Sequence, residues 1–292
     1  MVHAHESEAA FHITAEPQPI AMYNHAMTLP FSKSKITRIG ENLVKYKPPR
    51  EEDLNNLSQI LLTYDETLEL TTEKIEELGY SCTSRIKNTG TILEKLDRHG
   101  GSWLKSIQDL AGLRIVLPTT RNEQDRATGK IAAAFSDFPR EPRVIDRRTN
   151  PSHGYRAVHV IVYPNGLPVE IQVRTRWQHE WAEMFEKLAD LVGRDIRYGY
   201  PPRHWWHEIE RSADLTPEQE YHLDRVYDAA YAYRESLVEL ALAISDLIAG
   251  LENEESQNES EPEEIQSLWL TVHNDLADLR EAIREMEPFS DS

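Results

Sequence analysis

The chain has 292 residues, of which 50 are acidic and 32 are basic, so its formal net charge at pH 7 is −18. An acidic excess of this size excludes a protein that simply coats nucleic acid, because phosphate binding depends on Lys and Arg. With 39% hydrophobic and 28% charged residues, the composition is that of a folded globular protein. The length allows one medium domain with helical extensions or two small domains.

The acidic excess lies entirely in the last third of the chain. Residues 204–292 contain 23 Asp or Glu and 5 Arg, whereas residues 1–203 contain 27 charges of each sign. Within the balanced part, Arg85 to Arg148 carries 13 basic and 8 acidic side chains. The sequence therefore predicts a basic region followed by an acidic one.

Cysteine usage and hydropathy indicate a cytoplasmic protein. Cys82 is the only cysteine, so no disulfide forms within the chain and a cysteine-based zinc site lacks its ligands. The first ten residues lack the basic and apolar segments of a secretory signal. The longest apolar stretch, Leu237 to Leu251, contains Glu239 and Asp246 and is shorter than the roughly 20 residues of a membrane span. We expect no membrane segment.

Periodicity predicts strands that alternate with helices in the first two thirds of the chain. Residues 1–30 show no periodicity and are expected to form a flexible tail. The predicted elements that follow are helices near residues 32–44, 54–78, 90–98 and 122–135, and strands near 82–86 and 112–117. Such alternation is typical of layered α/β structures.

A hairpin and further helices complete the expected pattern. Two β-rich runs, residues 156–163 and 167–175, flank Pro164-Asn165-Gly166, where Asn-Gly supplies the positive φ of a tight turn. A helix follows to about Val192, and the Gly- and Pro-rich segment 193–202 marks a boundary. Pro217, preceded by Thr216 as N-cap, begins a helix that runs towards Gly250. An acidic linker over 252–264 and a helix over 265–286 end the chain. The predicted units are 1–30, 31–202 and 203–292.

The second hairpin strand has two chemically different faces. Val169, Ile171 and Val173 alternate with Glu170, Gln172 and Arg174, so one face is apolar and the other carries an acid, an amide and a guanidinium. A solvent-exposed sheet face is an ordinary alternative explanation of this strand alone.

Two other segments favour a phosphate-binding site. Asp109 precedes the strand that carries Arg114, and a pair of carboxylates suits Mg²⁺, which binds one or two carboxylates together with phosphate oxygens. Arg85, Lys87 and Lys95 surround the turn into a helix at 88–91. A helix N-terminus beside cations is a natural polyphosphate site.

These segments match, in order, the motifs of one known family. The string from Arg85 to Lys95 resembles R-x-K-x3-S-I-x2-K, and Asp109 to Ile115 resembles D-x-x-G-x-R-I. Arg143 to Asp146, then Asn150-Pro151 and Gly154 to His159, are similar to R-x-K-D, N-P and G-Y-x-x-x-H. Residues 170–182 are similar to E-I-Q-x-R-T followed by H-x-W-A. The chain thus resembles the RelA/SpoT alarmone synthetases over about 100 residues.

The resemblance implies a fold, an activity and a set of site residues. The implied fold is α+β, a mixed β-sheet flanked by helices like that of nucleotidyltransferases, here with a helical acidic C-terminal extension. The implied reaction transfers the β,γ-pyrophosphate of ATP to a nucleotide 3′-hydroxyl, with Mg²⁺ as cofactor. The implied ATP-binding residues are Arg85, Lys87, Thr91, Lys95 and Arg114. The implied catalytic and metal-binding residues are Asp109 and Glu170, and the implied acceptor-binding residues are Arg143, Asp146, Tyr155, His159, Gln172 and Arg174.

Some of these residues have plainer structural explanations, and the chain departs from the family pattern. Tyr155 and His159 also suit a protein core, and Trp181 suits a core better than a ligand contact. Ile145 stands where one branch of the family has Lys, which leaves the acceptor open among GDP, GTP and adenosine nucleotides. No His is followed by Asp, so the metal-hydrolase motif is absent. We expect a small synthetase without hydrolase activity.

Three alternative functions remain at this point. Ser32 to Gly40 resembles the first helix of small synthetases that include toxins, which pyrophosphorylate the 3′-CCA end of tRNA and act with an antitoxin partner. A non-catalytic binding module is disfavoured because Asp109 and Glu170 both persist. A polymerase-β-type nucleotidyltransferase is disfavoured because no Asp-x-Asp pair follows Gly100-Gly101-Ser102. The acidic helices are expected either to form a homo-oligomer or to fold back over the basic site.

Overall fold

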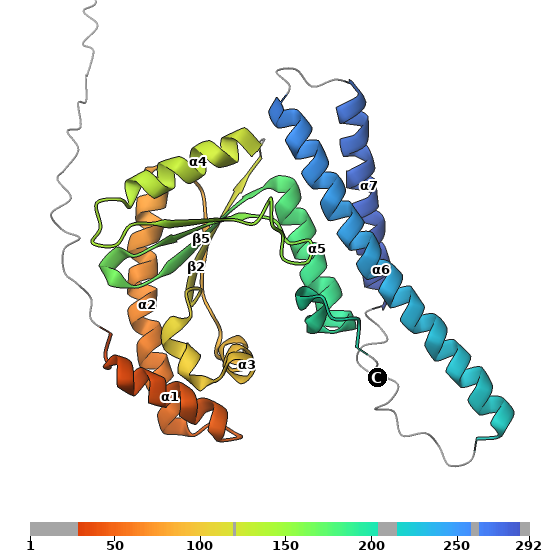
Figure 1. The fold of residues 1–292 in the computed structure, drawn as a ribbon, viewed down its shortest axis with the longest axis horizontal. Helices are drawn as coiled ribbons and strands as arrows, with labels where there is room; N and C mark the ends of the chain where they lie inside the picture. Colours follow the sequence, from red (N-terminus) through yellow and green to blue (C-terminus); the bar gives the residue numbers. More distant parts are fainter. Residues whose placement is uncertain (1–28, 119–120, 204–214, 258–262, 287–292) are drawn as a thin grey trace, which may run out of the picture.

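The computed structural model describes residues 29–118, 121–203, 215–257 and 263–286. It contains a mixed five-stranded sheet flanked by helices, with a long helical region at the C-terminal end, which confirms the expected fold class (Figure 1). In chain order the helices and strands are α1 (Lys33–Lys45), α2 (Glu51–Glu77), β1 (Thr83–Ile86), α3 (Thr89–His99), β2 (Ala111–Leu117), α4 (Arg121–Ala134), β3 (Arg143–Asp146), β4 (Val158–Val162), β5 (Val169–Thr175), α5 (Arg176–Val192), α6 (Pro217–Gln257) and α7 (Glu263–Met286). Most of the predicted tail, residues 1–28, lies outside the described residues.

The sheet has the order β1-β2-β5-β4-β3, in which β2 and β5 are parallel and the other neighbours are antiparallel. Glu170 is opposite Gly112 on β2 and Ile161 on β4, and Gln172 is opposite Arg114 and His159. Because directly opposed residues project to the same face of a sheet, Arg114, His159, Glu170 and Gln172 share one face. The polar face expected for β5 therefore extends over three strands.

The other face of the sheet is apolar and packs against α2 and α4, which lie side by side with it in Figure 1. Leu113, Ile115, Val160, Ile171 and Val173 are each at most 2% exposed. They belong to one continuous core with apolar residues of α1, α2, α3 and α4. This core keeps the sheet in place beneath the polar face.

Helices α5, α6 and α7 form a second core beyond the end of β5 (Figure 1). Trp181 and Leu188 of α5 pack with Ile244 of α6 and Leu276 of α7, all of them buried. Helix α5 begins directly after β5, and the Thr175 side chain caps it by accepting a hydrogen bond from the Gln178 backbone N–H. The acidic helices therefore share a core with the helix that follows the polar strand.

Three details differ from the sequence-based expectations. Strand β3 was not expected, because its residues include charged, partly exposed side chains typical of an edge strand and lack an apolar alternation. The hairpin turn is longer than a two-residue turn, since the last pair is Val162 with Val169, although Asn165 and Gly166 do have positive φ values of 54° and 80°. The acidic linker at 252–264 was wrong at its start, because α6 continues to Gln257.

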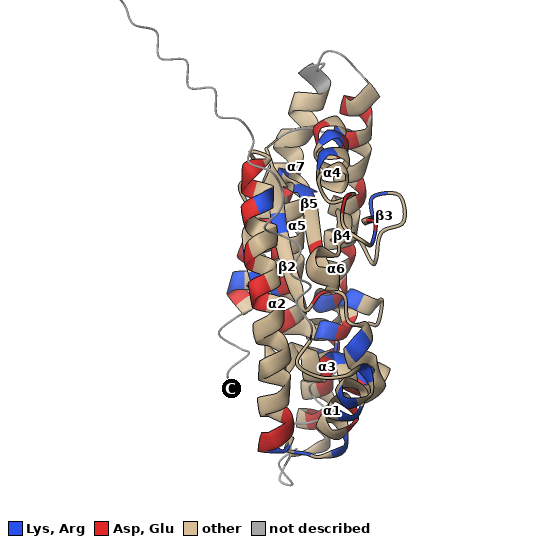
Figure 2. Cartoon of the chain, turned by 90° about the vertical axis from the view of Figure 1, so that its left-hand side faces the viewer, with Lys and Arg blue, Asp and Glu red and all other residues tan. Residues whose placement is uncertain are grey.

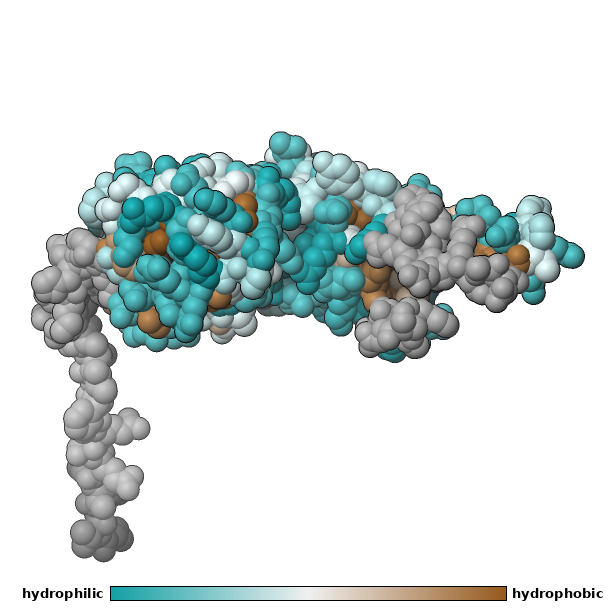
Figure 3. All heavy atoms as spheres, turned by 90° about the horizontal axis from the view of Figure 1, so that it is seen from below, coloured by the Kyte–Doolittle hydropathy of each residue, from teal (hydrophilic) through white to brown (hydrophobic). Residues whose placement is uncertain are grey.

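The charged and apolar side chains are unevenly distributed on the surface. Lys and Arg gather around α1 and α3 at one end of the molecule (Figure 2). Seen from that end, the described surface is mainly hydrophilic, with scattered apolar side chains (Figure 3). Among the described helices, none is long and apolar enough to cross a membrane.

The second core predicts a contrast between two positions on α6. Ile248 is 2% exposed in this core, so Ile248→Ala should lower the free energy of unfolding by about 2–5 kcal/mol. Leu240 on the same helix is 42% exposed, and Leu240→Ala should change it by no more than about 0.5 kcal/mol. Urea denaturation measures both, and equal effects would contradict the packing of α6 on α5.

Candidate active site

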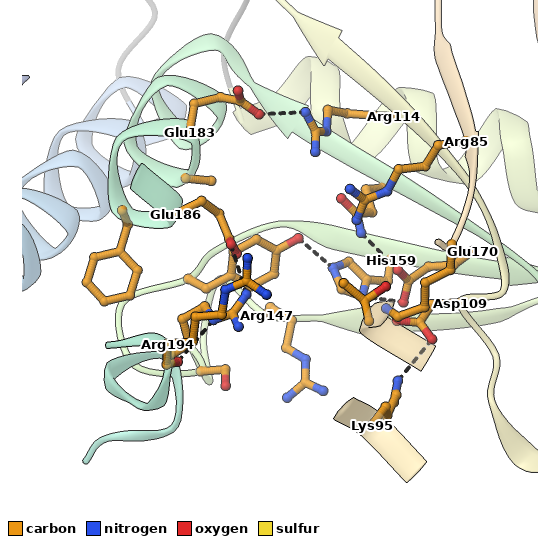
Figure 4. Close-up of a pocket in the computed structure, with 18 of the residues that line it drawn as sticks. Arg85, Lys95, Asp109, Arg114, Arg147, His159, Glu170, Glu183, Glu186 and Arg194 are labelled. Atoms are coloured by element: carbon orange, nitrogen blue, oxygen red, sulfur yellow. Dashed lines mark hydrogen bonds and ion pairs between the residues drawn. The ribbon is translucent and has the colours of Figure 1, made fainter. Parts of the chain in front are cut away.

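A cavity of about 630 Å³ opens on the polar face of the sheet, between α3, α5 and the short turn η3 (Arg194–Tyr198). Its walls bring together side chains that are far apart in the sequence (Figure 4). All but two of the predicted site residues line it, namely Arg85, Lys87, Thr91, Lys95, Asp109, Arg114, Tyr155, His159, Glu170, Gln172 and Arg174. The predicted ATP-binding, carboxylate and acceptor-binding groups thus face one space.

Asp109 is held between two lysines at one side of the cavity. Lys87 Nζ donates to Asp109 Oδ2 at 2.8 Å, and Lys95 Nζ donates to Oδ1 at 2.9 Å. Lys87 follows β1, Lys95 lies on α3, and Asp109 precedes β2. Burial raises the pKa of the Asp109 carboxyl, but the two ammonium groups outweigh this effect and hold the pKa below its usual value. The Asp109 carboxylate is therefore ionised and faces the cavity between two cations.

The N-terminal end of α3 opens on the same side. The Asn88 side chain caps the helix by accepting a hydrogen bond from the Thr91 backbone N–H at 2.8 Å. Asn88 and Thr91 both line the cavity, together with Arg85 on β1. Free backbone N–H groups at a helix N-terminus favour anions, so this end of the cavity suits a polyphosphate.

A closed ring of hydrogen bonds lines the cavity next to Asp109. Arg174 Nη2 donates to the Tyr155 hydroxyl at 3.0 Å, and this hydroxyl lies 2.9 Å from His159 Nε2. His159 Nδ1 lies 3.1 Å from Glu170 Oε1. Gln172 Nε2 donates to Glu170 Oε2 at 2.8 Å, and Arg174 donates back to Gln172 Oε1 at 2.9 Å. Each of the five side chains therefore orients its neighbours.

The ring sets the charge state of Glu170. Burial raises the pKa of the Glu170 carboxyl, but hydrogen bonds from His159 and Gln172 outweigh this effect, so its pKa lies below the usual value. Burial raises the pKa of Tyr155 above its usual value, so the phenol stays protonated. The ring presents an ionised carboxylate close to Asp109 (Figure 4).

The structure does not bring Arg143 and Asp146 to the cavity. Arg143 lies on edge strand β3, and its guanidinium donates to Gln108 Oε1 at 2.5 Å outside the cavity wall. Asp146 accepts hydrogen bonds from Arg148 instead. Since its neighbour Ile145 is opposite His159, the alternation of β3 turns Asp146 to the other face of the sheet. The acceptor-binding role expected for Asp146 therefore has no support in its position.

Several residues that the sequence did not single out do line the cavity. Arg147 comes two residues after Ile145 and lines the cavity. In the sequence, only its position in the basic region 85–148 pointed to a role in the site. Arg98, Arg194 and Arg197 stand at the cavity wall near Tyr198, and Arg98 donates to the Tyr198 hydroxyl at 2.6 Å. Arg197 pairs with Glu186 at 2.9 Å. Only the tertiary packing of η3 beside α3 reveals these arginines.

The carboxylates of the cavity suit a divalent cation that is bound together with a phosphate-containing substrate. No group of three or more His, Cys, Asp or Glu side chains within the described ranges forms a metal-binding cluster. Asp109 and Glu170 do offer two ionised carboxylates to one cavity. Mg²⁺ characteristically binds one or two carboxylates and completes its shell with substrate phosphates and water, so this donor set fits Mg²⁺ bound together with a nucleotide.

Comparisons with known proteins find matches to the segment that carries this cavity. Residues 84–189 match the model of the "Region found in RelA / SpoT proteins". The chain is 36% identical over 178 residues to an uncharacterized protein of Mycobacterium tuberculosis (strain ATCC 25618 / H37Rv), a match that covers 59% of this chain and 64% of that protein. It is 29% identical over 127 residues to a GTP pyrophosphokinase of Streptomyces antibioticus, covering 41% of this chain and 15% of that protein.

Two solved structures are also similar. Small alarmone synthetase 2 from Bacillus subtilis matches with a TM-score of 0.40 and 20% identity, over 63% of this chain and 97% of that one. Small alarmone synthetase 1 from Bacillus subtilis, bound to its product pppGpp, matches with a TM-score of 0.39 and 21% identity, over 63% and 96%.

The matched segment 84–189 runs from β1 into α5 and carries the lysines, the carboxylates and the hydrogen-bonded ring. This segment of the chain therefore matches the RelA/SpoT region, as the order of its motifs predicted. Arg194, Arg197 and Tyr198 of the cavity lie beyond the matched segment.

The lysine pair makes the titration of Asp109 testable. Asp109 stabilises the fold at pH values above the ordinary carboxyl pKa of about 4, and this contribution is lost as the pH falls through the lower pKa of the folded state. Lys87→Met removes one of the two charges, so the pKa of Asp109 should rise and the loss should begin at a higher pH. Carboxyl-carbon NMR measures the pKa, with Lys47→Met, whose partner is the exposed Asp97, as the control. An unchanged Asp109 pKa in Lys87→Met would contradict the conclusion that Lys87 lowers the pKa of this carboxyl.

Proposed function

We propose that this protein is an ATP-dependent pyrophosphokinase that transfers the β,γ-pyrophosphate of ATP to the 3′-hydroxyl of a guanosine or adenosine nucleotide. The observation that carries the proposal is one cavity in which a cation-held carboxylate, Asp109, lies close to a carboxylate ordered by hydrogen bonds, Glu170. Phosphoryl-type transfer depends on positioning and charge neutralisation, which cationic side chains and carboxylates supply. The motif resemblance and the RelA/SpoT match support the same reaction.

The cavity offers a separate place for each substrate. Lys87, Lys95 and the N-terminal end of α3 are suited to the phosphates of ATP, with Arg85 and Arg114 beside them. Tyr155 and Arg174 are suited to the base and ribose of the acceptor, because an aromatic ring and a guanidinium both stack on bases. The two substrates would then meet between Asp109 and Glu170.

In the proposed reaction, the acceptor 3′-oxygen attacks the β-phosphorus of ATP. The bond between this phosphorus and the oxygen that bridges the α- and β-phosphates breaks, and AMP leaves with that oxygen. The Glu170 carboxylate accepts the proton of the attacking hydroxyl, with His159 and Gln172 holding the carboxylate in place. Asp109 and Glu170 would hold Mg²⁺, which supplies charge neutralisation at the phosphates.

Two buried donor atoms of the cavity residues support an anionic ligand. Arg114 Nε and Arg174 Nε have no hydrogen-bond partner within the described part of the chain. A buried donor without a partner costs about 1–3 kcal/mol. Phosphate and ribose oxygens in the cavity are groups of the kind that accept such hydrogen bonds.

The residues near Tyr155 do not identify which nucleotide is the acceptor. Ile145 contributes no charge on the polar face, whereas Arg147 contributes a guanidinium to the cavity wall. Incubating the protein with labelled ATP and Mg²⁺, separately with GDP, GTP, AMP, ADP and deacylated tRNA, identifies the acceptor. Label in a nucleotide supports the proposal, and label in tRNA alone supports the toxin alternative instead. No label in any acceptor would contradict both.

We also propose that the purified product stays intact on further incubation, since no hydrolase motif is present.

Glu170→Gln tests the proton-accepting carboxylate. The amide keeps the size of the side chain but not its basicity, so the rate of pyrophosphate transfer should fall by about 10²–10⁴-fold. Glu186→Gln makes the same chemical change at a cavity residue whose side chain is 59% exposed and pairs with Arg197. This control should retain the rate within a few fold. A Glu170→Gln protein as active as the control would remove Glu170 from the mechanism.

A further inference from the structure

Helix α6 holds the segment that carries Tyr155. Ser245 Oγ donates to the Gly154 carbonyl oxygen at 2.5 Å and accepts from Arg156 Nε at 3.2 Å. Asp246 Oδ1 pairs with Arg156 Nη2 at 2.6 Å. The residues on both sides of Tyr155 are therefore bonded to α6, although Tyr155 itself faces the cavity.

Close packing reinforces this contact. Gly154 has a φ of 80°, a conformation that side chains disfavour, and a β-carbon at this position would lie 2.8 Å from the Trp181 ring and 2.9 Å from Leu242 of α6. The Trp181 indole N–H donates to the Ala241 carbonyl oxygen at 2.6 Å. The backbone at Gly154 thus fits between α5 and α6 with no room for displacement toward them.

A second contact from α6 reaches the end of β5. Glu252 is 3% exposed, and its carboxyl accepts hydrogen bonds from the Thr175 hydroxyl and from Gln178 Nε2, the latter at 2.7 Å. Thr175 follows Arg174 of the hydrogen-bonded ring and caps α5. Burial raises the pKa of Glu252 above its usual value, in keeping with a carboxyl enclosed by this junction. Glu252 therefore fixes the point at which β5 turns into α5.

The hydrogen bonds of α6 reach one half of the cavity. They hold segments 154–156 and 175–181, which flank Tyr155 and Arg174, whereas Lys87, Lys95 and Asp109 lie on β1, α3 and the loop before β2. No residue of α6 or α7 within the described ranges lines the cavity. One of the two sequence-based expectations was that the acidic helices fold back over the basic site. In the described part of the structure they do not cover the cavity. Instead, α6 holds the segments that carry Tyr155 and Arg174.

We propose that Ser245 and Glu252 of α6 are positioning residues for the acceptor substrate, which they align through Gly154-Tyr155-Arg156 and through Thr175. The proposal rests on the pyrophosphokinase activity proposed above. In this proposal α6 supports the acceptor site, although none of its residues lines the cavity. Loosening either contact weakens acceptor binding and leaves ATP binding unchanged.

Ser245→Ala tests the first contact with a small substitution that removes only the hydroxyl group. Removing this hydrogen bond should raise the KM for the acceptor roughly three- to tenfold, with the KM for ATP unchanged. Ser236→Ala is the matched control, because the Ser236 hydroxyl bonds only within α6, to the Ala232 carbonyl oxygen, and lies on the exposed side. Glu252→Gln is the second variant, which should give the same selective increase.

The readouts separate positioning from general destabilisation. A selective increase in acceptor KM in Ser245→Ala and Glu252→Gln, absent in Ser236→Ala, supports the proposal. Equal increases in both KM values, or no change in either, would overturn it. Amide hydrogen exchange over residues 152–159 gives an activity-independent test: it should be faster in Ser245→Ala than in Ser236→Ala, and equal rates would overturn the coupling. If the unmodified protein transfers no pyrophosphate at all, the proposed function fails, and the exchange experiment still decides whether α6 holds this segment.

Discussion

Strand β5 connects the core, the Glu170 carboxylate of the cavity and the helix α5 that packs on the C-terminal helices, and its alternation decides which side chains face the cavity. Val169, Ile171 and Val173 bury one face of the strand against the apolar core, which leaves Glu170, Gln172 and Arg174 on the other face. Since β5 pairs with β2 on one side and β4 on the other, it places these polar groups between Arg114 and His159. A shift by one residue would bury the polar groups and expose the apolar ones, so burial of the core also fixes the register of the site.

Ion pairs hold the cations of the cavity in place. Many of the cations that line it have an acidic partner in the structure, such as Lys87 and Lys95 on Asp109 and Arg114 on Glu183. In the function proposed above, substrate phosphates would replace these carboxylates as partners of the cations. The net charge of −18 is therefore no measure of what the cavity binds, because the acidic excess lies in the C-terminal region outside it.

The local pattern was sufficient for most of the fold. Local sequence patterns predicted strands at β2, β4 and β5, with clear apolar alternation in β5, and Asn-Gly predicted positive φ in the hairpin turn. Edge strand β3 was missed because its charged residues show no alternation. The acceptor-binding role of Asp146 was expected from the family motif alone, whereas the register of β3 turns this side chain to the face away from the cavity. The sequence also indicated which residues gather at the cavity, but through motif order rather than periodicity. The sequence did not predict that Arg194 and Arg197 line the cavity or that Glu252 is buried. Each of these features depends on contacts between segments that are far apart in the sequence.

The central claim is that the whole pyrophosphoryl group moves from ATP to a ribose 3′-oxygen. Phosphorus NMR of a reaction containing ATP, Mg²⁺ and the acceptor that accepts label measures this transfer directly. The account predicts that AMP accumulates in equal amount with an acceptor that carries a new diphosphate at its 3′-oxygen. Release of ADP with a single transferred phosphate, or of free pyrophosphate with an unmodified acceptor, would contradict it.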